Sequence, residues 1–229
     1  MMLLNFYGMP AWLEFGFLII AAITVNMAYR ASGSRSFLII LIAWSIVLSV
    51  ASFLEFFIFP AEHPERIPMV IGPGLATNII LLLTPRGRRW LRSWNLRITT
   101  YMHTIRIGVE LVLYALYGLG MVSILMTLEG TNWDILSGIT APVVAYIAFK
   151  DGKLRPDKKK LFLIWNVVCL ILLLNVVITA ILSVPTPFQQ FAFDQPNIGV
   201  FYFPFTLLPG VVVPLMLMGH LAALVNLKE

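Results

Sequence analysis

The sequence predicts an all-α membrane protein, a bundle of seven transmembrane helices with the N-terminus outside and the C-terminus in the cytoplasm. The first observation is composition: 59% of the residues are hydrophobic and 12% are charged, against about 45–50% and about 25% in typical soluble domains. The second is that the apolar stretches are continuous and do not alternate, which favours helices over a β-barrel. The third is the distribution of Lys and Arg between these stretches.

Seven stretches approach the roughly 20 apolar residues that cross a hydrocarbon core. With these spans, all 16 Lys and Arg residues except Arg66 and Arg106 lie on one side, and the positive-inside rule makes that side cytoplasmic. Deleting the third or the fifth span would leave strongly basic loops on opposite sides. We therefore expect one domain over residues 1–229 in the inner (plasma) membrane, with spans at 10–29, 36–59, 68–84, 104–127, 133–149, 161–184 and 200–226.

The first three spans and the segment after them have distinct features. The first span has no basic region before it and runs directly into Arg30, so it is not a cleavable signal peptide. The third span contains Gly72-Pro73-Gly74, which predicts a break in its helix. Residues 86–102 interleave Trp90 and Trp94 with arginines. This pattern predicts an interfacial amphipathic helix that contacts anionic lipid on the cytoplasmic leaflet.

The fourth span carries the most polar face. Arg106 precedes Glu110 by one turn, so the two side chains can pair along the helix. His220 of the seventh span, Asn78 of the third and Asn166 of the sixth fall at a similar distance from the cytoplasmic surface. Polar residues inside spans usually face the bundle interior. One interpretation is a pocket in which these five residues bind an ion, proton or polar ligand. The alternative is a structural Arg106–Glu110 ion pair, with asparagines that hydrogen-bond between helices.

A second group of polar residues is acidic and lies toward the outside. Glu14 is near the outer end of the first span, Glu55 is near that of the second, and Asp134 begins the fifth. Together they predict an acidic outer mouth that attracts cations. Alternatively, Asp134 interacts with the dipole of its own helix, while the two glutamates reach the headgroup region.

The sixth and seventh spans are joined by an outer segment, 185–205, that is rich in aromatic residues, prolines and amides. It is interpreted either as a lid over the mouth of the bundle or as a simple interfacial loop. Pro204, Pro209 and Pro214 predict a break in the seventh span. Broken helices in the third and seventh spans are typical of a transport site.

Two segments carry a resemblance to known sequences: TLEGTNWDILSGITAP at 127–142 and PTPFQQFAFDQPN at 185–197. In these the chain resembles an uncharacterised family of seven-span bacterial inner-membrane proteins with no assigned activity. The resemblance covers most of the length, and it implies no catalytic or binding residues.

Several function classes are excluded by what the sequence lacks. Walker, GxSxG and HExxH patterns are absent. Cys169 is the only cysteine, which excludes an intramolecular disulfide and thiolate clusters. We expect no metal, no cofactor and no nucleic-acid partner, and the sequence favours the absence of enzymatic activity without deciding it. The sequence favours a small carrier or channel-like protein for an ion or small polar solute. The alternatives are a non-transporting module (sensor, assembly partner or lipid-binding scaffold) or an intramembrane enzyme acting on a lipid or isoprenoid.

Overall fold

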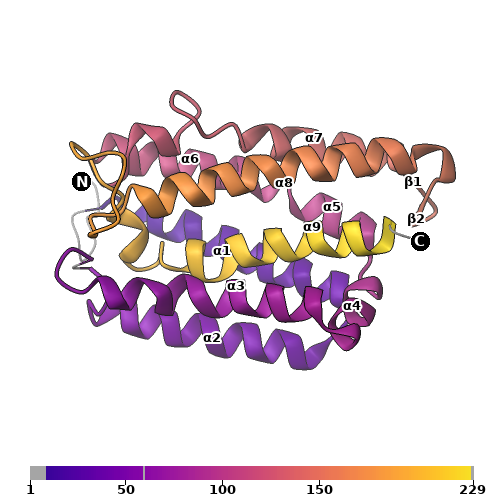
Figure 1. Ribbon diagram of the computed structural model, residues 1–229, viewed down its shortest axis with the longest axis horizontal. Coiled ribbons are helices and arrows are strands. Elements are labelled where there is room, and N and C mark those ends of the chain that lie inside the picture. The colour runs from indigo at the N-terminus through magenta and orange to yellow at the C-terminus, as the bar shows by residue number, and fades with distance from the viewer. Residues whose placement is uncertain (1–8, 59, 228–229) are drawn as a thin grey trace.

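The structure is a computed structural model that describes residues 9–58 and 60–227. Helices make up 72% of the chain, and the longer ones run side by side along one axis, as Figure 1 shows. The all-α class is confirmed. The long helices are α1 (Ala11–Ser32), α2 (Arg35–Phe53), α3 (Ile67–Leu83), α8 (Lys159–Leu182) and α9 (Val213–Leu227).

Five segments within the described residues are long and apolar enough to cross a membrane. Their helices carry large apolar side chains on the outer surface of the bundle, for example Ile39, Ile80 and Ile171. Exposed apolar surface of this extent is typical of contact with lipid. The five segments are Ala11–Ser32, Arg35–Phe53, Pro64–Leu83, Pro156–Leu182 and Leu208–Leu227.

Two short helices replace the long helix predicted at 104–127. They are α5 (Leu96–Met102) and α6 (Ile105–Gly118), with a turn at His103 between them. Both contact α1 and α7, so they form one broken pass along the bundle. The pass begins earlier than predicted, and its helix also ends earlier. Beyond α6 the chain turns at Gly120, whose φ of 74° favours glycine.

The helix α7 (Ile135–Ala148) begins part-way along the bundle (Figure 1). Its 14 residues extend over about 21 Å at 1.5 Å per residue, less than the roughly 30 Å of a hydrocarbon core. The preceding segment contains only the short turn η2 (Ile124–Met126), and it buries Thr127 and Asn132. Irregular backbone inside a membrane bundle is tolerated where protein covers it. This irregular segment forms part of the candidate site.

The interfacial helix predicted at 86–102 is not a single helix. Its first half is α4 (Pro85–Arg92), which carries the exposed basic surface that was expected. Asn95 then accepts hydrogen bonds from two backbone N–H groups of the following turn and starts a new helix, α5. Because α5 buries Thr99 and Met102, the second half lies inside the bundle and not along its surface.

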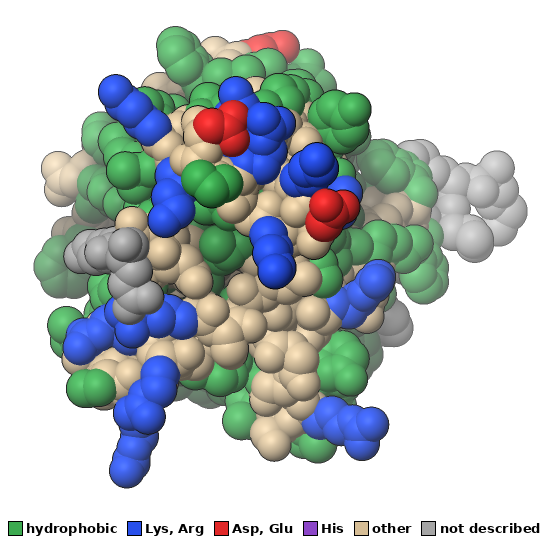
Figure 2. All heavy atoms as spheres, turned by 90° about the vertical axis from the view of Figure 1, so that its right-hand side faces the viewer, with side chains coloured by type: hydrophobic (Ala, Val, Ile, Leu, Met, Phe, Trp, Pro, Cys, Tyr) green, Lys and Arg blue, Asp and Glu red, His purple; other side chains and the backbone are tan. Residues whose placement is uncertain are grey.

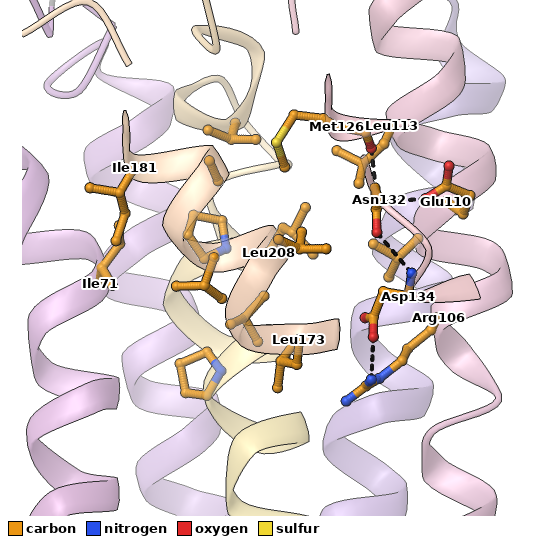
Figure 3. Close-up of a pocket in the computed structure, with 18 of the residues that line it drawn as sticks. Ile71, Arg106, Glu110, Leu113, Met126, Asn132, Asp134, Leu173, Ile181 and Leu208 are labelled. Carbon is orange, nitrogen blue, oxygen red and sulfur yellow. Dashed lines mark hydrogen bonds and ion pairs between the residues drawn. The ribbon is translucent and has the colours of Figure 1, made fainter. Parts of the chain in front are cut away.

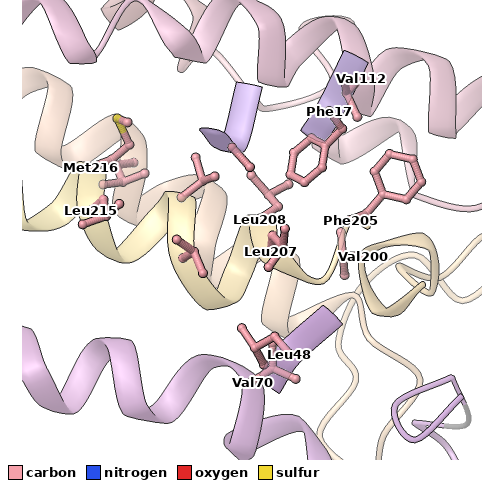
Figure 4. Close-up of a cluster of buried hydrophobic side chains, with 14 of the residues drawn as sticks. Phe17, Leu48, Val70, Val112, Val200, Phe205, Leu207, Leu208, Leu215 and Met216 are labelled. Atoms are coloured by element: carbon pink, nitrogen blue, oxygen red, sulfur yellow. The ribbon is translucent and has the colours of Figure 1, made fainter. Parts of the chain in front are cut away.

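The bundle is organised around α9. In the candidate span Leu208–Leu227, which contains α9, 78% of the residues of the apolar stretch are buried. The corresponding share in the other four candidate spans is 11–33%. The π-helical turn η5 (Leu208–Val212) precedes α9. Apolar side chains from the surrounding helices converge here, among them Phe17 of α1 and Leu48 of α2 (Figure 4). Gly210 allows this close packing, because a Cβ atom there would lie 2.4 Å from Leu48 Cδ1.

The predicted break in the third span does not occur, since α3 continues through Pro73. Gly74 has another role, because a Cβ atom at this position would lie 2.4 Å from Cγ of Pro214. The absence of a side chain at Gly74 therefore lets α3 and α9 approach. In the seventh span, the turn η5 does interrupt regular α-helical geometry before α9.

The end of the bundle at which α4 and the β1–β2 hairpin lie is basic. Seen from this end, many Lys and Arg side chains and few Asp and Glu side chains are spread over the surface (Figure 2). The hairpin turns at Asp151 and Gly152, which have φ values of 50° and 77°. Its strands are β1 (Phe149–Lys150) and β2 (Lys153–Leu154), followed by the turn η3 (Pro156–Lys158).

At the opposite end, the segment 183–207 folds over the end of α6. Asn197 is fully buried; its Oδ1 accepts from the backbone N–H of Ser123 at 2.9 Å. Gln195 Nε2 donates to the carbonyl oxygens of Tyr117 and Val122. These bonds hold the segment against the bundle. The short turns at this end are η1 (Pro64–Arg66) and η4 (Gly199–Phe201).

Candidate functional site

A salt bridge inside the bundle joins α6 to the start of α7. Arg106 Nη1 lies 2.5 Å from Asp134 Oδ1, and the two side chains are only 3% and 12% exposed. Ser137 Oγ donates to the same carboxylate oxygen at 3.2 Å. The helices can approach because Gly138 has no side chain: a Cβ atom there would lie 3.0 Å from the backbone nitrogen of Ile107. Buried charges require partners, so this pair fixes α7 against α6.

Arg106 also contacts α9. Its Nη2 lies 2.9 Å from Nε2 of His220. Because a guanidinium group has donors only, Nε2 accepts this bond and carries no hydrogen. The hydrogen is then on Nδ1, which donates to Asn166 Oδ1 at 3.0 Å. Asn166 Nδ2 in turn donates to the carbonyl of Phe162 at 2.8 Å. The network therefore defines His220 as a neutral imidazole protonated on Nδ1.

A second histidine lies against the first. The rings of His103 and His220 stack with centroids 4.1 Å apart and planes 19° apart. The ring of Trp165 meets His103 edge-on at 5.7 Å. Nδ1 of His103 is buried, with no hydrogen-bond partner among residues 9–58 and 60–227. Since His103 lies in the turn between α5 and α6, the break in this pass is next to the polar network.

Glu110 anchors the irregular segment before α7. Its Oε1 accepts from the backbone N–H of Leu128 at 2.5 Å, and its Oε2 accepts from Asn132 Nδ2 at 2.7 Å. Asn132 Oδ1 accepts from the backbone N–H of Asp134 at 3.1 Å. Asn132 thus links Glu110 to the salt bridge. We call the resulting network the polar chain; its members are Glu110, Asn132, Asp134, Arg106, His220 and Asn166.

The polar chain differs from the sequence prediction in two ways. Arg106 pairs with Asp134, so the predicted ion pair between Arg106 and Glu110 is wrong. Glu110 is also deeper than expected: 14 residues of the broken pass separate it from Leu96, which is about 21 Å at the helical rise. It therefore lies against the segment that precedes α7, and the two predicted polar layers are connected through Asn132.

Asn78 belongs to a different contact. Its Nδ2 donates to the carbonyl oxygens of Gly74 at 2.9 Å and of Pro214 at 3.1 Å. It joins α3 to α9 at the close approach of Gly74 and Pro214. Of the five residues predicted to form one pocket, Arg106, His220 and Asn166 are therefore in direct contact with one another through His220. Glu110 is connected to them through Asn132, and Asn78 is not part of this network.

The acidic outer mouth is not assembled as predicted. Glu14 is buried on α1, and Glu55 is exposed beyond the end of α2, with a φ of 61°. Asp134 is drawn into the bundle by Arg106. Across the described ranges, no group of three or more His, Cys, Asp or Glu side chains is placed to hold a metal ion.

A cavity of about 90 Å³ lies beside the polar chain. One wall is polar and carries Arg106, Glu110, Asn132 and Asp134. The other walls are apolar and come from α3, α8, η5 and α9 (Figure 3). The cavity has room for several water molecules, and a site of this kind, apolar with a few convergent polar groups, is typical of ligand binding.

Comparison of the sequence with known protein families finds one match. Residues 67–228 match the family described as "Domain of unknown function (DUF8737)". The chain belongs to this family. No curated protein and no solved structure matches the chain.

The DUF8737 region contains every residue of the polar chain and every residue that lines the cavity. It begins at the first residue of α3, so α1 and α2 precede it. The family description confirms an uncharacterised family, as the resemblance implied.

One member of the polar chain in the DUF8737 region, Asn132, was missed by sequence reasoning. The predicted spans 104–127 and 133–149 leave only residues 128–132 between them, so the predicted topology places Asn132 in an outer loop. The signal that could have identified it is the density of polar residues in TLEGTNWD immediately before a short apolar helix. Such a segment can fold into the bundle only if its polar groups find partners there.

Proposed function

We propose that the protein is a multi-pass protein of the bacterial inner (plasma) membrane with seven spans, the N-terminus outside and the C-terminus in the cytoplasm. Two observations support this topology. Helices α1, α2, α3, α7, α8 and α9 and the broken α5–α6 pass run lengthwise in one bundle (Figure 1). The end that carries α4 and the β1–β2 hairpin is basic (Figure 2), as the cytoplasmic end of such a bundle should be. This end would contact anionic lipid headgroups.

The orientation is tested with single cysteines in a Cys169→Ala background. Glu65→Cys lies in η1 and Lys153→Cys lies in β2, at opposite ends of the bundle. A membrane-impermeant maleimide added to intact cells should label Glu65→Cys and spare Lys153→Cys. The opposite labelling pattern, or labelling of both, would overturn the orientation.

We further propose that the protein acts as a small carrier or channel-like protein for an ion, proton or small polar solute bound in the cavity. The observation that carries this proposal is the position of Glu110. Glu110 is one of the residues that line the cavity, and its carboxylate accepts hydrogen bonds from uncharged donors, Leu128 and Asn132. Arg106, the basic group in the same wall, is paired with Asp134. An acid inside a membrane bundle whose partners, among the residues that the structure describes, are uncharged is typical of ion and proton pathways.

Irregular helices around the cavity further support transport. The break between α5 and α6 lies one turn before Arg106, the short α7 starts beside Asp134, and η5 contributes Leu208 to the lining. Discontinuous helices at the middle of a bundle form the substrate sites of many carriers. In this protein the discontinuities occur mainly in the α5–α6 pass and at α7.

Reconstituted protein tests the function. Proteoliposomes loaded with a pH-sensitive dye should show a proton or methylammonium flux above that of empty liposomes. Glu110→Gln should lower this flux at least tenfold. Glu129→Gln, an exposed acid on the neighbouring loop, is the matched control and should retain it. Flux is compared per amount of folded protein. Wild-type flux no greater than that of empty liposomes, or equal flux in Glu110→Gln, would contradict the proposal.

A second candidate is a non-transporting membrane module: a sensor, an assembly partner or a lipid-binding scaffold. It is favoured by the apolar side chains that form most of the cavity lining, and ligand binding without flux would support it. An intramembrane enzyme on a lipid or isoprenoid has less support. Acid–base catalysis needs two groups at one substrate position, whereas Asp134 is occupied by Arg106 and Glu55 is exposed beyond α2.

A further inference from the structure

The cavity reaches the outer surface of the bundle between α3 and α8. Ile71 of α3 and Ile181 of α8 both line it, and Ile181 is 38% exposed. Figure 3 draws these two side chains at one end of the cavity and the polar wall at the other. Met69 of α3 and Ile178 of α8, beside the opening, are exposed on the outer surface. The opening therefore faces the bilayer close to the start of α3 and the end of α8.

The end of the cavity toward the outer loops is covered. Its lining includes Val200 and Phe201 of η4 and Val184, which follows the end of α8 by two residues. All three are buried. The segment that carries them is held down by Asn197. A solute dissolved in water outside meets this cover, whereas a molecule dissolved in the bilayer meets the opening between α3 and α8.

The polar wall has an excess of acidic groups. Three ionisable side chains line the cavity: Arg106, Asp134 and Glu110. The charges of Arg106 and Asp134 compensate each other in their salt bridge. Glu110 remains, with one hydrogen bond to each oxygen, and a carboxylate offers about four acceptor sites. The wall therefore has capacity for a cationic hydrogen-bond donor.

We propose that the cavity binds an amphipathic cation, a protonated amine on a short apolar chain, that reaches it from the bilayer between α3 and α8 and places its ammonium group on Glu110. The apolar chain lies against Ile71, Leu208 and the facing side of α8. This proposal rests on the proposed carrier function and specifies the class of its solute. Burial of the chain supplies affinity in proportion to its apolar area, and the ammonium–carboxylate contact supplies selectivity.

Binding is measured by calorimetry on the full chain in nanodiscs of phosphatidylcholine, with corrections from empty nanodiscs. The probes share one chain length and differ in head group: n-hexylamine, n-hexanol and n-hexanoate. We expect n-hexylamine to bind at least tenfold more tightly than n-hexanoate. Glu110→Gln should remove that preference and leave n-hexanol binding unchanged, while Glu129→Gln should behave as wild type. Equal binding of the amine and the carboxylate, or an unchanged preference in Glu110→Gln, would overturn the proposal.

Two tryptophan substitutions in α8 test whether the ligand enters from the bilayer. Ile181→Trp narrows the opening, whereas Ile178→Trp adds the same bulk to an exposed position of the same helix. Neither touches the polar chain. The first variant should slow n-hexylamine association at least fivefold and the second should not. Equal association rates in the two variants would contradict access between α3 and α8.

The flux assay separates this inference from the carrier proposal. If methylammonium flux depends on Glu110 but n-hexylamine does not bind, the carrier function stands and the amphipathic cation is wrong. If n-hexylamine binds through Glu110 but no cation is transported, the ligand class stands and the carrier function is wrong.

Discussion

Arg106 and Asp134 form a buried salt bridge although 28 residues separate them in the chain. The bridge is possible because α7 starts inside the bundle, directly after Asp134. It sets the position of α7 and orders one wall of the cavity.

Asp134→Ala is expected to destabilise the protein by about 3–5 kcal/mol, the effect of leaving one charge of a buried pair without its partner. Unfolding by heat or SDS in detergent measures this change. The control is Asp157→Ala, which removes an exposed bridge of 2.9 Å to Arg155 and should alter stability little. Arg106→Met combined with Asp134→Leu should recover most of the loss. Equal stability of Asp134→Ala and Asp157→Ala would show that the bridge does not hold α7.

Gly138 is predicted to be necessary for the approach of α7 to α6. In Gly138→Ala the new Cβ atom would lie 2.9 Å from Ile107 Cγ1 and 3.0 Å from the Ile107 backbone nitrogen, so the helices must separate. We expect a loss of about 1–3 kcal/mol from overpacking, measured by thermal unfolding. Gly16→Ala in α1 is the control, because a Cβ atom there meets nothing within 4 Å. It should be neutral or stabilising, since alanine favours the helix. A stable Gly138→Ala protein would refute the packing argument.

Glu110 is predicted to hold the segment before α7 in place. Glu110→Ala removes the acceptor of the Leu128 N–H and the partner of the Asn132 amide. A hydrogen bond to a charged group contributes about 1.5–3 kcal/mol, so hydrogen exchange at Leu128 should accelerate at least tenfold. Mass spectrometry of the peptide covering 124–134 reports this rate. Exchange in Glu129→Ala should match wild type, and an unchanged rate in Glu110→Ala would exclude the anchoring role.

The helical bundle could be predicted from the sequence because apolar length and charge asymmetry act over whole spans. The prediction differed from the structure where single residues override the hydropathy of a whole segment. Residues 119–126 are apolar enough to extend a helix, but Gly120 turns the chain. Asn95 starts a helix in the middle of a predicted amphipathic segment. Both effects depend on single residues that an average over a span does not register.

Part of the site was also predictable. Polar residues inside spans were expected to face the interior, and Arg106, His220 and Asn166 do meet there. Their partners could not be deduced, because helical spacing favours Glu110 as the partner of Arg106 whereas the tertiary fold brings Asp134 closer. A contact across 28 residues depends on where α7 begins, and the sequence alone does not define that position.

The protonation state of His220 gives the last prediction. Arg106 donates to Nε2 and Asn166 accepts from Nδ1, so the imidazole is expected to remain neutral around pH 7 as the Nδ1–H tautomer. A second proton on Nε2 would direct an N–H group at a guanidinium group, and two donors repel. Nitrogen-15 chemical shifts of the two ring nitrogens distinguish the tautomers. In Arg106→Met the constraint on Nε2 disappears and the tautomers should mix. An Nε2–H tautomer in the wild-type protein would contradict the hydrogen-bond network of the polar chain.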